Sequence, residues 1–109
     1  MSDADRRRLG AILASIALIL EYAATPDWAH DQKTVDAIAK RLEDIGDQAG
    51  SLTEEALESM PTIPWRAIIG TRTRIAHDCG AFDTDITQRT IDADLPVLRR
   101  TIEQALGRD

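Results

Sequence analysis

An arginine and a histidine in the second half of the chain have the side chains that metal-free phosphodiester chemistry needs. Arg72 carries a planar, permanently charged guanidinium that matches phosphate oxygens, and the imidazole of His77 belongs to the side-chain type that titrates nearest neutral pH. An imidazole can move a proton to or from an RNA 2′-hydroxyl or a leaving oxygen, while a guanidinium stabilises the charge that develops on phosphorus. The alternative is an exposed helix face with a histidine near a helix C-terminus.

The surroundings of this pair are unusually basic for this chain. Residues 64–82 contain three arginines and a single acidic residue, Asp78, whereas the whole chain has a formal net charge of -6. A negative net charge argues against non-specific binding to nucleic acid, because phosphate contacts need Lys or Arg. A local basic cleft can still bind RNA within an acidic molecule, so any such function must be local.

The spacing of the two residues constrains how they could act together. At about 100° per residue, Arg72 and His77 lie roughly 140° apart around a regular helix, whereas Thr73 and Arg74 share a face with His77. Two arrangements could bring the pair together. The helix could end before His77, or a second subunit could contribute its copies across a two-fold axis, which predicts an isologous dimer with the site in its cleft.

The sequence predicts neither a metal ion nor a cofactor. His77, Asp78 and Cys79 are metal-capable, but a closed zinc site needs about four ligands and there is no second cluster of Cys and His. There is no glycine-rich phosphate loop and no strand pattern that would form a dinucleotide fold. The single cysteine excludes an internal disulfide and fits the reducing cytosol, so we expect a cytoplasmic protein.

The composition favours one all-α domain spanning residues 1–109, built as an antiparallel bundle of four to five helices. Only 4% of residues are aromatic, so the core must be made from Leu, Ile, Val and Ala. A first helix, capped by Ser2 or Asp3, is apolar nearly all round, which suits either the core or a contact with a partner subunit. Arg6, Arg7 and Arg8 before this apolar run imitate a secretory signal. We expect a core helix instead. Its apolar run is too short to span a bilayer.

The remaining elements follow from turn and capping signals. A second helix is expected from about residue 31 to 49, and Ser51 to Glu54 resembles a capping box that opens a short helix. Trp65 opens the helix that carries Arg72, and we expect its indole to pack over the bundle end rather than stack on a base. Residues 80–83 form a turn. A final helix to Leu106 should bend just before Pro96.

Several segments resemble the HepT branch of the HEPN superfamily. The segments that carry the resemblance are Ile63-Pro64-Trp65, Ile68-Ile69-Gly70, Arg72 with four residues before His77, Ile45-Gly46-Asp47-Gln48-Ala49 followed by Ser51-Leu52-Thr53, and Asp94-Leu95-Pro96-Val97-Leu98 with Ile102. They occur in the family's order, without large gaps, over most of the chain. The resemblance implies an all-helical homodimeric ribonuclease that acts on RNA without a metal. It also implies a toxin paired with a minimal nucleotidyltransferase (MNT) antitoxin.

The resemblance assigns the catalytic roles to Arg72 and His77, which match the family's Arg-x4-6-His motif. We expect Arg72 to stabilise the phosphate and the transition state and His77 to transfer the proton. Thr73 and Arg74 would help to position the substrate, and Asp78 could orient the imidazole.

Two positions depart from the family's pattern. Thr73 replaces the asparagine that usually follows the arginine, and Cys79 replaces the tyrosine that in the family accepts AMP from the antitoxin. A thiol at this modification site has no phenol oxygen to accept AMP. These departures leave open an alternative function, a non-catalytic HEPN module that binds a nucleotidyltransferase partner and its nucleotide or substrate. A plain dimeric helical bundle with an interaction role is a third possibility.

Overall fold

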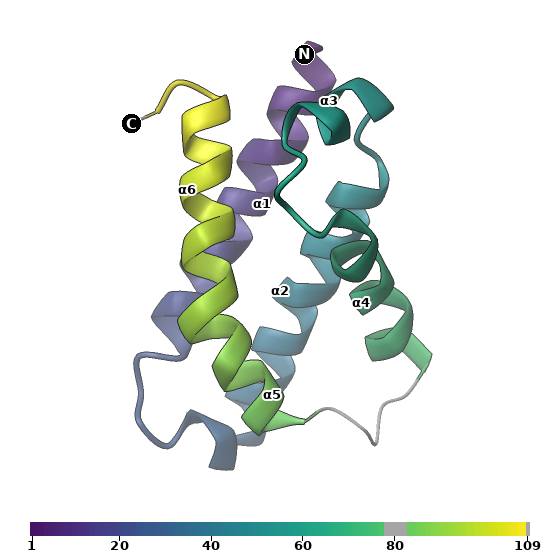
Figure 1. The fold of residues 1–109 in the computed structure, drawn as a ribbon. Helices are drawn as coiled ribbons and strands as arrows, with labels where there is room; N and C mark the ends of the chain where they lie inside the picture. Colours follow the sequence, from purple (N-terminus) through teal and green to yellow (C-terminus); the bar gives the residue numbers. More distant parts are fainter. Residues whose placement is uncertain (78–82, 109) are drawn as a thin grey trace.

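The computed structural model describes residues 1–77 and 83–108, and these residues form helices and connections with no strand. The α-helical prediction is therefore confirmed. Four long helices run in alternating directions, in the spatial order α4, α2, α1, α6 (Figure 1). The elements are α1 (Asp3–Tyr22), η1 (Trp28–His30), α2 (Gln32–Gly50), α3 (Glu54–Ser59), α4 (Trp65–His77), α5 (Thr84–Arg89), η2 (Thr90–Asp94) and α6 (Leu95–Ala105).

Helix α1 forms the centre of the core. Its Leu9, Ile12, Ile16 and Ile19 are fully buried at the i, i+3, i+4 spacing of one helix face. This stripe is covered by α2 and α6 of the same chain, so it is core and not a surface for a partner subunit. Among the described residues, no helix combines the length and the apolar character that a membrane crossing would need.

The carboxylate of Asp5, near the start of α1, is hydrogen-bonded to Thr53 at the start of α3. Asp5 is buried and accepts hydrogen bonds from the Thr53 backbone N–H at 3.0 Å and from the Thr53 hydroxyl at 2.7 Å. The Thr53 hydroxyl oxygen also accepts from the Ala56 N–H, so Thr53 is the N-cap of α3. The expected capping box at Ser51 is therefore wrong, because Ser51 instead donates its hydroxyl to the Asp47 carbonyl at the end of α2.

The connection between α1 and α2 is fixed to α5 through a tryptophan. Trp28 is 2% exposed, and its indole N–H donates to Gln88 Oε1 at 2.7 Å. His30, the other histidine of the chain, is exposed at the end of η1.

The expected irregularity before Pro96 is present as a turn of π-helix, η2. The Leu95 N–H donates to the Thr90 carbonyl five residues earlier, and Pro96 follows in the first turn of α6. Proline lacks an N–H and its ring crowds the carbonyl four residues before it, so a wider turn relieves both conflicts. Figure 1 shows α5 inclined to α6 on either side of this turn. Helix α6 is capped by Leu106 and followed by Gly107, whose φ of 72° is readily accessible to glycine.

Candidate functional site

Helix α4 is set in place by the tryptophan at its start. Two prolines, Pro61 and Pro64, lie in the preceding connector, where each fixes its own backbone. Trp65 is 8% exposed, and its indole N–H donates to the Met60 carbonyl at 3.2 Å. The indole is therefore used for packing, as predicted, and does not offer a free face on which a nucleic-acid base could stack.

Helix α4 lies along α2 and carries the predicted site residues toward one end of the bundle (Figure 1). Ile68 and Ile69 are half-buried against the core on this side. The helix continues through His77, so the possibility that it ends before this residue is wrong. Because α4 is unbroken between Arg72 and His77, the two positions are separated by about 140° around its axis.

Four of the six predicted site residues lie on α4. Arg72, Thr73, Arg74 and His77 belong to the last two turns of α4, so the fold brings these four positions onto one short helical segment. Asp78 and Cys79 lie outside the described residues. By spacing, the position of Arg72 is on the same helix face as those of Ile68 and Ile69, which are half-buried against the core.

An apolar cavity of about 340 Å³ lies beside α4, between α2 and α6. Its walls include Leu42 and Ile45 of α2, Ile68 of α4, and Leu95 and Leu98 of α6. The polar residues that line it are Thr62, Thr71, Thr90 and Asp94. Val97 also lines this cavity and is 51% exposed, which is high for a large apolar side chain.

This cavity was not foreseen from the sequence. Its four polar lining residues come from three parts of the chain: Thr62 from the connector before α4, Thr71 from α4, and Thr90 and Asp94 from the π-helical turn. Pro96 indicated a bend in the last helix. It does not indicate which other helices face that bend across the cavity. Because Thr71 directly precedes Arg72, the cavity adjoins the segment that carries the predicted catalytic pair.

Helix α4 differs from the other α-helices in its charge. It contains three arginines and one histidine but no Asp or Glu, whereas every other α-helix of the described residues has at least one acidic residue. Arginines without acidic residues on the same helix favour a positive local potential, which attracts phosphate in an otherwise acidic molecule. Within residues 1–77 and 83–108, no group of three or more His, Cys, Asp or Glu side chains could hold a metal ion.

Comparison with known proteins relates nearly the whole chain to HepT-like ribonucleases. The family model described as ribonuclease HepT-like matches residues 5–105. A probable ribonuclease HepT of Thermococcus cleftensis is 27% identical over 107 residues, which cover 95% of this chain and 97% of that protein.

Two further relatives are provisionally named as RNases. The first, from Caldanaerobacter subterraneus subsp. tengcongensis, is 26% identical over 76% of this chain and 74% of its own length. The second, from Methanocaldococcus jannaschii, is 24% identical over 84% of this chain and 87% of its own length. No solved structure gives a significant match. Since the family model spans residues 5–105 of a 109-residue chain, this protein belongs to the HepT-like ribonuclease family.

Proposed function

We propose that the protein is a metal-independent ribonuclease toxin of a HepT/MNT toxin-antitoxin pair and that it cleaves RNA with Arg72 and His77. The observation that carries this proposal is the family match over residues 5–105 together with an intact Arg-x4-His motif. Further support comes from the motif helix α4, which has arginines without acidic residues in a chain of net charge -6.

The proposed reaction is transesterification through the RNA 2′-hydroxyl. The imidazole of His77 accepts the 2′-hydroxyl proton while the 2′-oxygen bonds to phosphorus. The bond from phosphorus to the 5′-oxygen then breaks, and a proton returned from the imidazolium neutralises that oxygen. The products are a 2′,3′-cyclic phosphate and a 5′-hydroxyl. Arg72 stabilises the charge on the phosphoryl oxygens, Thr73 and Arg74 position the substrate, and Asp78 orients the imidazole.

We further propose that the active form is a homodimer in which the apolar cavity beside α4 is covered by a second copy. Arg72 and His77 lie on different sides of one continuous helix, so a single chain does not gather them by helical spacing alone. The half-exposed Val97 and the apolar lining of the cavity favour a surface that is buried on association. A two-fold axis there would bring two copies of α4 close together.

The deciding experiment is RNA cleavage by the purified protein and by His77→Ala and Arg72→Ala variants. We expect each variant to lose about 100-fold or more in cleavage rate, the usual cost of removing a catalytic proton carrier or a transition-state donor. Chelator should not reduce the activity, and 2′-O-methyl RNA should not be cleaved because it has no 2′-hydroxyl proton. Expression of the wild-type chain should inhibit growth, and expression of either variant should not.

A second candidate is favoured by Thr73 and Cys79, the two departures from the family's pattern. In this alternative the chain is a non-catalytic HEPN module that binds a nucleotidyltransferase partner and presents nucleotide or substrate to it. Wild-type protein that binds such a partner but leaves RNA uncut at every concentration would establish this alternative. Cleavage that His77→Ala abolishes would exclude it.

A further inference from the structure

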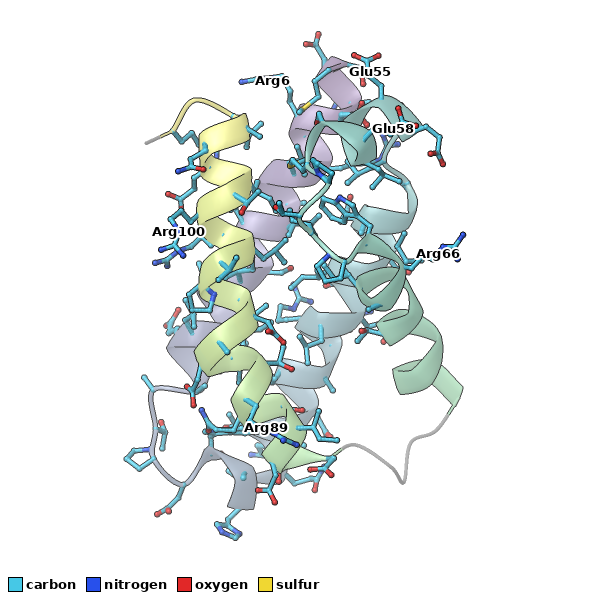
Figure 2. The ribbon with its side chains drawn as sticks, in the orientation of Figure 1. Arg6, Glu55, Glu58, Arg66, Arg89 and Arg100 are labelled. Atoms are coloured by element: carbon cyan, nitrogen blue, oxygen red, sulfur yellow. The ribbon has the colours of Figure 1, made fainter. Side chains whose placement is uncertain are left out.

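Arg66 is an exposed arginine on α4 to which neither the predicted chemistry nor the packing assigns a role. Its guanidinium forms no ion pair or hydrogen bond with any residue that the structure describes. Other arginines are used within the chain: Arg6 donates to the Leu106 carbonyl, Arg41 pairs with Asp44, and Arg99 pairs with Glu103. Figure 2 shows Arg66 directed away from the bundle on the α4 side.

The position of Arg66 on the helix relates it to His77. The two are eleven residues apart on one unbroken helix, which is about three turns, so they fall within roughly 20° of each other around the axis. The distance between them along the axis is about 16 Å. A ligand that lies along this face of α4 would therefore pass both positions.

The neighbouring tryptophan restricts what such a ligand could contact at this end. Trp65 is buried and its indole N–H is taken by the Met60 carbonyl, so it offers no ring face for base stacking. An exposed guanidinium, by contrast, binds phosphate oxygens irrespective of the base attached. The group that a ligand can contact at this end of α4 is thus the guanidinium and not the indole, and a phosphate oxygen is a partner that it can bind whatever the base.

We infer that Arg66 binds a backbone phosphate of a single-stranded RNA substrate, more than one nucleotide away from the phosphodiester that is cut. This inference rests on the proposed ribonuclease function and extends it along α4. The site would favour RNA long enough to reach from His77 to the start of α4, with little preference for sequence at the distant nucleotide.

The test compares the full-length wild type with Arg66→Ala, Arg66→Lys and Arg100→Ala on a dinucleotide and on a longer single-stranded RNA. Arg100 is the matched control, because it is equally an exposed arginine without an ion pair among the described residues but lies on the α6 side of the molecule (Figure 2). The readouts are kcat/KM on both substrates and the salt dependence of binding to 2′-O-methyl RNA of the longer length.

For Arg66→Ala we expect the preference for the longer RNA over the dinucleotide to fall roughly two- to fivefold at low salt, through a higher KM for the longer RNA. The slope of log affinity against log salt should decrease by about 0.7, the value for one phosphate contact on a single strand. Arg66→Lys should restore most of the preference, and Arg100→Ala should match the wild type.

The possible failures are distinguishable. If the wild type cleaves RNA but Arg66→Ala keeps the full preference and the same salt slope, the inference is wrong and the ribonuclease function stands. An equal loss in Arg66→Ala and Arg100→Ala would also overturn it, since the effect would then come from general charge. If the wild type neither binds nor cleaves RNA, both proposals fail together.

Discussion

The carboxylate of Asp5 illustrates how much one buried side chain can organise. The two hydrogen bonds from Thr53 stabilise the charged form and lower the pKa of Asp5 from 3.8 to about 2. A carboxyl whose folded-state pKa is lowered contributes stability above its unfolded pKa, and this contribution is lost as the pH falls toward the folded pKa. The Asp5 contribution is therefore complete above about pH 4 and is lost between about pH 4 and pH 2.

Replacing Asp5 should make the free energy of unfolding depend less on pH in the acid range. For Asp5→Asn we expect a lower free energy of unfolding at neutral pH and a smaller decrease between about pH 4 and pH 2 than in the wild type. Urea unfolding followed by circular dichroism at a series of pH values measures both. Asp36→Asn, at an exposed position on α2, is the control and should keep the wild-type slope. An unchanged acid limb in Asp5→Asn would contradict the assignment.

At this scale sequence reasoning could propose a catalytic pair, which stays a prediction, but it could not find the role of Asp5. Arg72 and His77 have only four residues between them and match a family motif, so local spacing was enough to propose them. The partner of Asp5 is 48 residues away, and nothing in the local pattern connects them. The same applies to Thr53, since Ser51 and Thr53 are both competent caps and tertiary contact with α1 selects Thr53.

At the scale of elements, a hydrogen bond from the buried indole N–H of Trp28 to Gln88 links η1 to α5. Gln88→Ala would leave the Trp28 N–H without its partner in a site that is 2% exposed, and this should cost about 1–3 kcal/mol of folding free energy. Thermal or urea unfolding measures this loss. Gln104→Ala, an exposed glutamine on α6, should change stability by less than about 0.5 kcal/mol. Equal stability of the two variants would show that the indole finds another acceptor.

The existence of the elements followed from the sequence more readily than their details. The apolar run of the first helix predicted a core helix, and its Leu9, Ile12, Ile16 and Ile19 are fully buried. Pro96 predicted a bend in the last helix, but a proline signal does not specify whether the backbone kinks or widens. The π-helical turn that results is a property of how α5 and α6 pack on the other helices, which local propensity does not contain.

At the scale of the whole molecule, the proposed dimer makes a specific demand on Val97. A charged side chain in the apolar surface beside the cavity would be buried without a partner on association, so Val97→Glu should shift the protein from dimer to monomer. Light scattering coupled to size exclusion measures the mass, and RNA cleavage per chain should fall with it. Ile86→Lys is the control, since Ile86 is 53% exposed but does not line the cavity. A Val97→Glu variant that stays dimeric would place the interface elsewhere.

The first and last residues that the structure describes lie at the same end of the bundle, whereas α4 finishes toward the other (Figure 1). A purification tag or a fluorescent protein joined at either terminus is therefore carried away from the segment that holds Arg72 and His77. Labelled versions of this chain should keep the end that carries the proposed site unobstructed, so single-molecule and in-cell experiments can use either attachment point.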